Sequence, residues 1–516
     1  MLGQAKSVML QGAEGLIISV ECDVSQGMPG FQMVGYLSAE VREAKERVVA
    51  AFRNSGYRIT PKKTTINLMP ACIHKSGTGF DLPIAVSIGQ AYGLVHCSYI
   101  GEIIFIGEIN LTGRIQQVSG ILPMLLEAGK QGYSVCMVPE ENYEEACLIG
   151  EMQVIGVHHL KQVMELLKVP NIEDMVKTYR LQPRKEPKTV AQKNPKRDIP
   201  DFSEIRGQFA LKRACEVAAC GMHNLLMVGP PGTGKSMAAK AMTGILPELS
   251  LEEQLEVASI YSISGKFGEV QAFFGKRPFR SPHHGITPRG LTGGGNPVRP
   301  GEVSLANHGV LFLDELAECS GESLESLRQP LEEGRVQITR ANGTFTFPAD
   351  FCLVAAMNPC PCGYYPDLKR CTCTPAMIRR YQGKVSGPLL DRIDICVQVP
   401  EVEFEYLTKE DQAETSADIL KRVKQAHAIQ QRRFQKEEIL FNAQMDLKQI
   451  KKYCQLNSEL ERYMEDIFSK MHLSARSYHR ILKVARTIAD LGGHDSLQKQ
   501  DIQEAILYRE AVGEWN

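Results

Sequence analysis

The segment Gly229-Pro-Pro-Gly-Thr-Gly-Lys-Ser236 constrains the fold of this chain more than any other stretch. It follows the apolar run LLMV at 225–228 and precedes MAAKAM at 237–242. Strand, glycine-rich turn and helix in this order bind phosphate, because inward-facing backbone N–H groups and the positive end of the helix dipole meet the anion. The motif predicts that Lys235 reaches the β and γ phosphates and that Ser236 ligates Mg²⁺. The predicted nucleotide-binding residues are Gly229, Pro230, Pro231, Gly232, Thr233, Gly234, Lys235 and Ser236.

Two acids complete the predicted site. The apolar run Val310-Leu-Phe-Leu ends in Asp314 and Glu315, and ligands of open parallel sheets bind where the strands end. We expect Asp314 to hold Mg²⁺ through water and Glu315 to polarise the attacking water as general base. Taken alone, such a run is also an ordinary strand end, and its pairing with the loop favours catalysis. The sequence has no Asn-Lys-x-Asp guanine-reading motif, so we predict ATP rather than GTP.

The length of 516 residues predicts two to four domains. Residues 1–168 alternate short apolar runs with turns around one amphipathic helix at 38–54, which Ser38 caps and Gly56 stops, and they indicate a mixed α/β domain. A proline-rich basic stretch at 181–200 indicates a linker, placed at 169–201, that is either a solvated tether or an arm touching nucleic acid. Alternating strands and helices predict a parallel sheet at 202–400, and 401–516 is helical.

Composition limits the partners and the compartment. Lys and Arg number 59 and Asp and Glu number 60, which leaves a net charge of -1, so nucleic acid would have to be met by local basic patches. No apolar run of about eighteen residues and no secretion signal occur, which predicts a cytoplasmic protein without a membrane partner. Its 15 cysteines are then expected to be mostly reduced.

Two later residues extend the site. Asn358 ends a third apolar strand, FCLVAAM at 351–357, where an amide can position the lytic water; a lone Asn there is otherwise a turn former. Arg392 lies in SGPLLDRID at 386–394, too far along the chain to be assumed part of the same site. In ring ATPases an arginine in this context enters the neighbour's site and stabilises transition-state charge. The alternative is an ion pair with Asp391 or Asp394.

The order of these segments resembles the YifB/ComM family of magnesium-chelatase-like AAA+ ATPases, over essentially the whole chain. The resemblance is strongest in RPFRSPHHGIT at 277–287, GGGNPVRPGEVSLANHGVLFLDEL at 293–316 and LRQPLEEGRVQITRA at 327–341. It implies an AAA+ core in which Asn358 is sensor 1, Arg392 the arginine finger and Arg476, in LSAR at 473–476, the sensor 2 arginine on a helical lid. It also implies a homo-hexameric ring, in which each neighbour supplies an arginine.

Residues 1–168 resemble the Lon protease fold, most clearly in HKSGTGFDLP at 74–83 and GEINLTGRIQQVSG at 107–120. Proteolysis in that fold needs a serine nucleophile and a lysine base within hydrogen-bond reach. By the resemblance, those positions fall on Gly79 and Leu122, neither of which can do the chemistry. We therefore expect no peptidase activity, and a scaffold or substrate-handling collar instead.

Two loops of the predicted core carry cations and aromatics suited to phosphate contact and base stacking. The first is KRPFRSPHH at 276–284, and the second is VQITRANGTFTF at 336–347. Alternation on both sides of Asn342-Gly343 predicts a β-hairpin with Arg340 near its tip. The alternatives are that both loops brace subunit contacts and that His283 and His284 bind a metal.

Four cysteines cluster as C-x-C, an eight-residue gap and a second C-x-C: Cys360, Cys362, Cys371 and Cys373. Four thiolates satisfy tetrahedral zinc, and a loop without its own core gains stability from the metal. We predict a structural Zn²⁺ site; reduced thiols and a redox switch are the alternatives.

Three functions follow as hypotheses. The family resemblance implies an ATP-driven motor on single-stranded or branched DNA, performing branch migration or helicase-like translocation in recombination and natural transformation, alongside recombination proteins. The second is insertion of magnesium into a porphyrin, and the third is remodelling or regulation of proteins. The fused N-terminal domain and the cysteine cluster favour the first over the chelatase, which needs separate partner subunits.

Overall fold

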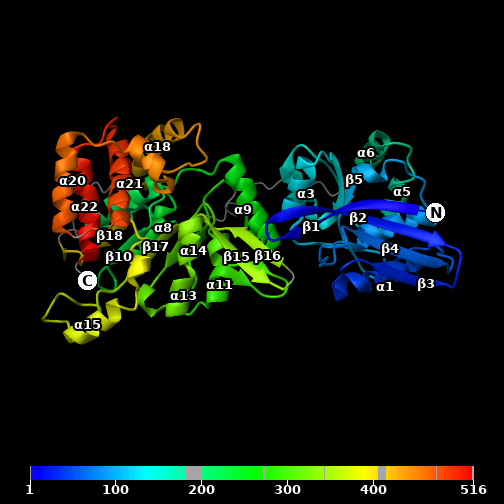
Figure 1. Ribbon diagram of the computed structural model, residues 1–516, viewed down its shortest axis with the longest axis horizontal. Coiled ribbons are helices and arrows are strands. Elements are labelled where there is room, and N and C mark those ends of the chain that lie inside the picture. The colour runs from blue at the N-terminus through cyan, green and yellow to red at the C-terminus, as the bar shows by residue number, and fades with distance from the viewer. Residues whose placement is uncertain are drawn as a thin grey trace. The chain divides into compact units, whose positions relative to one another are not determined.

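The computed structural model describes residues 2–181, 199–270, 275–341, 343–404, 414–471 and 473–513 (Figure 1). They form two compact units. The N-terminal unit comprises 1–193 together with 255–272 and 337–347, and the ATPase unit comprises 194–254, 273–336 and 348–516. Most of the predicted linker, residues 182–198, lies outside the described residues.

The N-terminal unit is built on a mixed seven-stranded sheet in the order β3-β4-β2-β1-β5-β8-β9. β1 and β4 each run antiparallel to β2, whereas the remaining neighbours are parallel. Buried and more exposed residues alternate along β2 because successive side chains point to opposite faces. The strands are β1 (Leu2–Gln11), β2 (Glu14–Ser25), β3 (Gly30–Val34), β4 (Lys63–Met69), β5 (Ile103–Phe105), β8 (Val135–Pro139) and β9 (Gln153–Val157), with a separate pair β6 (Glu108–Ile109) and β7 (Ile115–Gln116).

The predicted amphipathic helix of this unit is confirmed as α1 (Ala39–Asn54), and the Ser38 hydroxyl accepts a hydrogen bond from the N–H of Val41 at 3.4 Å. The other helices are α2 (Asp81–Ala91), α3 (Ile121–Lys130), α4 (Tyr143–Ala146), α5 (Leu160–Leu166) and α6 (Ile172–Leu181). α6 falls in the range that the sequence assigns to the linker. It is held to the sheet because Tyr179 is buried and its hydroxyl accepts the N–H of Gly156 at 2.7 Å.

The ATPase unit contains a five-stranded sheet in the order β11-β14-β17-β10-β18, with every neighbouring pair parallel. The predicted parallel sheet is thereby confirmed. Its strands are short and almost wholly buried, as expected where helices cover both faces. They are β11 (Phe279–Arg280), β14 (Val310–Leu313), β17 (Cys352–Met357), β10 (Leu225–Val228) and β18 (Ile395–Gln398).

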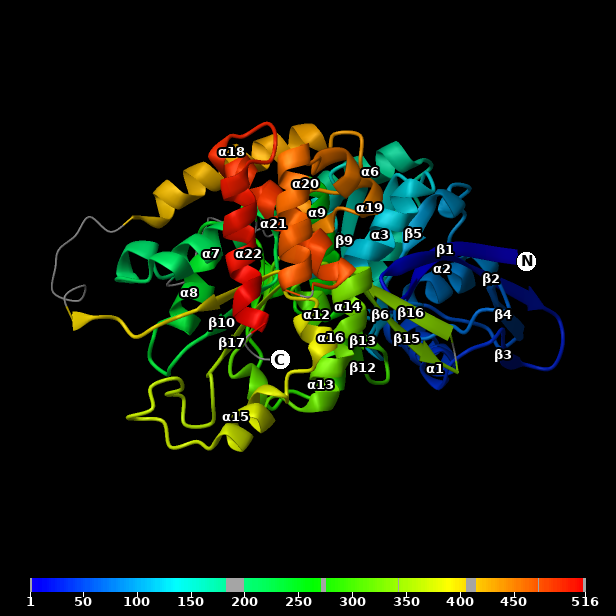
Figure 2. The ribbon, with the colours of Figure 1, turned by 60° about the vertical axis from the view of Figure 1, so that its left-hand side comes forward.

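Helices surround this sheet, and the C-terminal region is helical as predicted. α20, α21 and α22 lie side by side in both views (Figures 1 and 2), and α18, α21 and α22 share one apolar core with β10, β17 and β18. Among the described helices, none is long and apolar enough to cross a membrane. The main helices are α7 (Phe209–Gly221), α8 (Lys235–Met242), α13 (Gly321–Ser326), α14 (Arg328–Glu333), α15 (Pro375–Gln382), α18 (Ser416–Arg433), α19 (Leu447–Tyr453), α20 (Ser458–Lys470), α21 (Ala475–Gly492) and α22 (Lys499–Gly513). The helix α9 (Leu251–Ile263) begins in this unit and continues into the N-terminal unit from residue 255.

Smaller elements of the ATPase unit are α11 (Pro288–Thr292), α12 (Glu302–Leu305), α16 (Gly387–Leu390) and the strand pair β12 (Gly293–Gly294) and β13 (Arg299–Pro300). The helix α10 (Phe267–Val270) and most of the hairpin β15 (Arg335–Arg340) and β16 (Gly343–Pro348) come from the same stretch of sequence but belong to the N-terminal unit. The hairpin predicted around residue 343 is confirmed, although Asn342 lies outside the described residues.

Two segments inside the ATPase sequence belong to the N-terminal unit, residues 255–272 and 337–347. The N–H of Ala13 donates to the carbonyl of Thr346 at 3.1 Å, and the N–H of Gly120 donates to the carbonyl of Ser262 at 3.1 Å. The approach at the first contact is so close that a Cβ on Gly12 would lie 2.6 Å from the Thr346 oxygen. Tertiary contacts thus join segments that are far apart in the sequence into one compact unit.

Candidate nucleotide site

Three parallel strands bring the predicted site residues to one edge of the sheet. β17 lies between β14 and β10, with Ala355 opposite Leu313 and Met357 opposite Val228. The chain leaves the carboxyl ends of these strands as the phosphate loop at 229–234, as the two acids at 314–315, and as Asn358. This edge is where ligands of open α/β sheets bind.

The phosphate loop turns sharply and then starts α8 at Lys235. Gly232 and Gly234 have φ values of 79° and 90°, a region that favours glycine. The ammonium of Lys235 lies within the turn, donating to the carbonyl oxygens of Gly229 at 2.7 Å and Pro230 at 2.6 Å. Burial lowers the pKa of Lys235, and the carboxylate of Asp314 opposes that shift. A polyphosphate in the loop would therefore meet a cation that is already desolvated.

The two predicted magnesium ligands are in contact although 78 residues separate them. The hydroxyl of Ser236 donates to Asp314 Oδ2 at 2.7 Å. A hydroxyl and a carboxylate at this distance fit the oxygen ligand set of Mg²⁺, which takes one or two protein oxygens, phosphate oxygens and water. The residues present at this edge therefore suit a metal–triphosphate complex.

Glu315 adopts an unusual backbone conformation and has a partner that the sequence did not indicate. Its φ and ψ are 51° and 46°, a left-handed conformation that costs a non-glycine residue about 1–3 kcal/mol. His284 Nδ1 lies 2.9 Å from Glu315 Oε2, so the histidine suggested as a metal ligand contacts the predicted general base instead. No local pattern could show this contact, because 31 positions separate the residues in the sequence.

The loop after Asn358 packs against the phosphate loop. Gly363 is buried, and a Cβ added to it would lie 2.7 Å from Pro231 Cδ and 3.9 Å from Asn358 Cγ. Both the turn that would cradle phosphate and the predicted water-positioning amide therefore neighbour this one glycine. In the sequence, the only sign of this proximity is that Cys360 follows Asn358 after a single residue.

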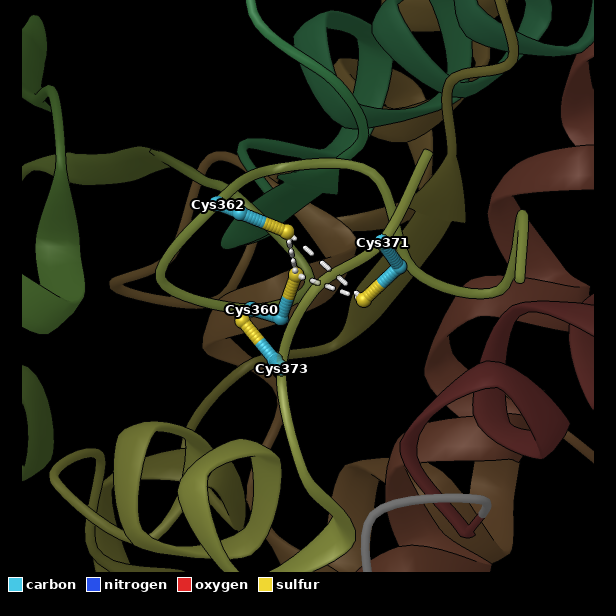
Figure 3. Close-up of side chains that lie close together, drawn as sticks. All are labelled: Cys360, Cys362, Cys371 and Cys373. Carbon is cyan, nitrogen blue, oxygen red and sulfur yellow. Dashed lines mark hydrogen bonds between the residues drawn. The ribbon is translucent and has the colours of Figure 1, made fainter. Parts of the chain in front are cut away.

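The four cysteines of this loop are gathered together (Figure 3). The Sγ atoms are 3.3 Å apart for Cys360 and Cys362, 3.8 Å for Cys360 and Cys371, and 3.6 Å for Cys362 and Cys371. All four Sγ atoms, including that of Cys373, lie within 4.8 Å of one another. The cluster could hold a metal ion.

The two predicted arginines of the motor both contact Glu332. The guanidinium of Arg392 is paired with this carboxylate and also donates to the carbonyl of Pro388 at 2.7 Å, and Arg476 Nη2 lies 3.5 Å from Glu332 Oε1. Arg392 is only 9% exposed. The alternative partner Asp394 is taken by Arg480. Burial acts to raise the pKa of Asp394, but the charge of Arg480, together with the hydrogen bond and charge of His223 and the charge of Lys483, lowers that pKa well below its usual range.

The first predicted nucleic-acid loop is engaged within the fold. Arg277 is 4% exposed and donates to Glu253 at 2.8 Å and to the carbonyl oxygens of Pro247 and His308. Arg280 binds Glu302 with two nitrogens, at 2.6 and 2.9 Å. Acids 24 and 22 positions away thus neutralise these two arginines, and contact of this loop with nucleic-acid phosphates stays a prediction.

The positions that the Lon resemblance assigns to a protease dyad have apolar surroundings. Leu122 is fully buried, and a Cβ on Gly79 would meet methyl groups of Ile106 and Val118 at 3.4 and 3.5 Å. Neither position offers a hydroxyl or an amine.

Comparison with known families covers most of the chain. A family described as "Magnesium chelatase, subunit ChlI" matches residues 201–407, one described as "Subunit ChlI of Mg-chelatase" matches residues 20–142, and "Magnesium chelatase, subunit ChlI C-terminal" matches residues 413–509. These are magnesium-chelatase-like AAA+ families, which implies the use of ATP and Mg²⁺.

Two proteins are similar to this chain over nearly their full length. The chain is 39% identical to the competence protein ComM of Haemophilus influenzae over 507 residues, which is 97% of this chain and 96% of ComM. It is 40% identical to YifB of Salmonella typhimurium over 95% of this chain and 94% of YifB. The magnesium-chelatase 38 kDa subunit of Cereibacter sphaeroides is 26% identical over 42% of this chain and 65% of that subunit. The sheet-edge site and these full-length matches together show that the chain belongs to the YifB/ComM family of magnesium-chelatase-like AAA+ ATPases.

Proposed function

We propose that this protein is an ATP-driven ring motor that remodels DNA, with branch migration or helicase-like translocation as its activity. The observation that carries the ATPase part is the 2.7 Å contact between Ser236 and Asp314 beside the buried ammonium of Lys235. The DNA part is supported by the full-length similarity to a protein named for competence, since competence is the uptake of DNA.

In this proposal each residue at the sheet edge has one task. Lys235 binds the β and γ phosphates, while Ser236 and Asp314 hold Mg²⁺, which draws charge from the phosphate oxygens. Glu315 takes a proton from the attacking water, and Asn358 orients that water. His284 Nδ1 lies 2.9 Å from Glu315 Oε2, which leaves Oε1 of the same carboxylate to accept the proton from water.

The proposal includes a hexameric ring in which Arg392 acts on the site of a neighbour and Arg476 acts from the lid. Both arginines contact Glu332 within one chain. Since a carboxylate and a phosphate compete for the same guanidinium, nucleotide bound at a subunit boundary would draw the arginines away from Glu332.

We propose that Arg289 and Arg299 contact DNA, since Arg277 and Arg280 are already paired with acids of the fold. Both side chains are exposed; Arg289 lies on α11, which precedes β12, and Arg299 is the first residue of β13. Within the described part of the chain, neither guanidinium is paired with a carboxylate. Exposed guanidinium groups without a carboxylate partner suit contact with a phosphate backbone.

This proposal is tested by the rate of ATP hydrolysis with and without single-stranded and branched DNA. We expect DNA to stimulate the wild type severalfold, and R289E/R299E to keep the basal rate while losing the stimulation. Losing two phosphate contacts should also reduce the salt dependence of DNA binding by about two in slope. K448E/K451E on α19 is the matched control, with the same charge change at two exposed lysines.

Two outcomes would contradict the DNA assignment. If no DNA changes the rate of ATP hydrolysis but unfolded protein raises it, the protein is a protein-remodelling ATPase. If porphyrin together with the partner subunits of a chelatase raises the rate, the protein is a chelatase. The partial match to the chelatase subunit, over 42% of the chain, makes the second the weaker alternative.

We further propose that the cysteine cluster holds structural Zn²⁺. Zinc–sulfur bonds of about 2.3 Å place tetrahedral sulfurs about 3.8 Å apart, and three of the Sγ–Sγ distances here are 3.3, 3.6 and 3.8 Å. All 15 cysteines are free thiols in this structure. The spacing therefore supports a shared metal rather than disulfides, whose sulfurs are about 2.05 Å apart.

The N-terminal unit is proposed to serve as a scaffold without peptidase activity. Purified protein should leave casein intact at any ATP concentration, because the positions of Gly79 and Leu122 carry neither nucleophile nor base. Gel analysis of casein after prolonged incubation measures this. Cleavage that persists in K235A but disappears when the N-terminal unit is mutated would refute the assignment.

A further inference from the structure

The loop between Asn358 and α15 has almost no core of its own. Within residues 361–374, all of which the structure describes, Gly363 alone is buried, and Leu368 is 83% exposed. The loop contains neither helix nor strand. Too little apolar surface is buried here to offset the conformational entropy of ordering some fourteen residues, so another interaction must hold the loop.

The cysteines supply that interaction at both ends of the loop. Cys360 and Cys362 lie at its start, and Cys371 and Cys373 lie where it returns to α15 (Figure 3). The N–H of Gly363 donates to the carbonyl of Cys360 at 3.0 Å, which closes a tight turn between the first two cysteines and the glycine. A metal bound by the four thiolates would therefore fix the position of Gly363 directly.

Gly363 is the point at which this loop meets the phosphate loop. Its φ is 88°, and an added Cβ would lie 2.7 Å from Pro231 Cδ and 3.4 Å from Pro231 Cγ. A proline ring is rigid, so such a Cβ could be accommodated only if the phosphate loop or the loop that carries Gly363 moved, and either movement separates the two loops. The backbone of Gly363 is therefore in close contact with the turn that would bind the phosphates.

We propose that Zn²⁺ at Cys360, Cys362, Cys371 and Cys373 braces the phosphate loop, by clamping Gly363 onto Pro231 beside Asn358. This inference rests on the proposed ATPase function and adds a positioning role to the metal. The zinc does not touch nucleotide. It keeps the turn in its phosphate-binding shape, so its loss should impair both ATP binding and hydrolysis.

The test uses the full-length protein and two variants that break the brace at different places. C371S removes a ligand and should lower zinc, measured by metal analysis, from one per chain to well below one. G363A leaves all four thiols and should retain zinc, but its methyl group separates the two loops. Because misplacement of a catalytic group by about 1 Å costs about 10²-fold, we expect each variant to lose about 10- to 100-fold in kcat/KM, with weaker ATP binding.

Two matched control variants distinguish loss of the Gly363–Pro231 contact from nonspecific destabilisation of the protein. G493A places alanine at another glycine of positive φ, 70°, where an added Cβ meets nothing within 4 Å. C147S changes an exposed cysteine outside the cluster. Both controls should retain zinc and wild-type kcat/KM, and thermal melts should show C371S and G363A still folded.

The outcomes are distinct. Suppose that the wild-type protein contains zinc and hydrolyses ATP. If G363A then keeps both its zinc and the wild-type kcat/KM, the positioning role of the zinc is contradicted and the ATPase function stands. Wild-type protein with well under one zinc per chain overturns the metal. Wild-type protein that does not hydrolyse ATP overturns the proposed function, and this result appears before any variant is made.

Discussion

K235A is expected to lower the rate of ATP hydrolysis by about 10²- to 10³-fold, the loss seen when one preorganised electrostatic group is removed from a transition state. The ammonium of Lys235 lies within the turn, where two carbonyl oxygens at 2.7 and 2.6 Å hold it beside the phosphate position. Burial has already lowered the pKa of this group, so its charge acts at short range in a poorly solvated site. Steady-state phosphate release measures the effect.

Lys240 provides the control for this variant, since it is an exposed lysine further along the same helix, α8. K240A should hydrolyse ATP at the wild-type rate and melt at the wild-type temperature. Hydrolysis that survives in K235A would show that residues 229–236 do not bind the nucleotide, and the motor function would fail with it.

R392A is expected to bind ATP with wild-type affinity and to hydrolyse it about 10³- to 10⁵-fold more slowly, the range of an arginine finger. The reason is that an arginine acting on a neighbour's site contacts the transition state far more strongly than the bound substrate. Equilibrium binding of a labelled ATP analogue and single-turnover hydrolysis separate the two quantities.

Mixing two inactive variants tests whether Arg392 acts between subunits. K235A carries an intact Arg392, and R392A carries an intact phosphate loop, so mixed rings should regain part of the lost hydrolysis. If Arg392 only stabilises its own chain through Glu332 and Pro388, mixing would restore nothing and R392A would melt at a lower temperature.

The sequence correctly predicted features that arise from local rules. The helix at 38–54 followed from periodicity and a serine cap, and α1 has both. Strand, turn and helix around residue 229 followed from the glycines and the apolar run, and β10 and α8 flank the turn as expected. In each case the residues that specify the element are neighbours along the chain.

Contacts between residues far apart in the sequence were not predicted. The cations at 277 and 280 matched a phosphate-binding pattern, yet Glu253 and Glu302 neutralise them. Likewise, nothing near residue 284 shows that its imidazole meets Glu315, and nothing near residue 346 shows that its carbonyl meets Ala13. A charged side chain pairs with whichever opposite charge the fold brings within reach. The spacing of residues in the sequence does not predict which partner that is.

By itself, then, the sequence determined which residues can bind phosphate, ligate a metal or end a strand, because those properties reside in side-chain chemistry and short-range backbone preference. Only the tertiary structure decided which of them meet: Ser236 with Asp314, Arg392 with Glu332, and Gly363 with Pro231. The physical reason is that partners separated by tens of residues are selected by packing of the whole sheet and its helices. One strand order, β14-β17-β10, sets the nucleotide edge.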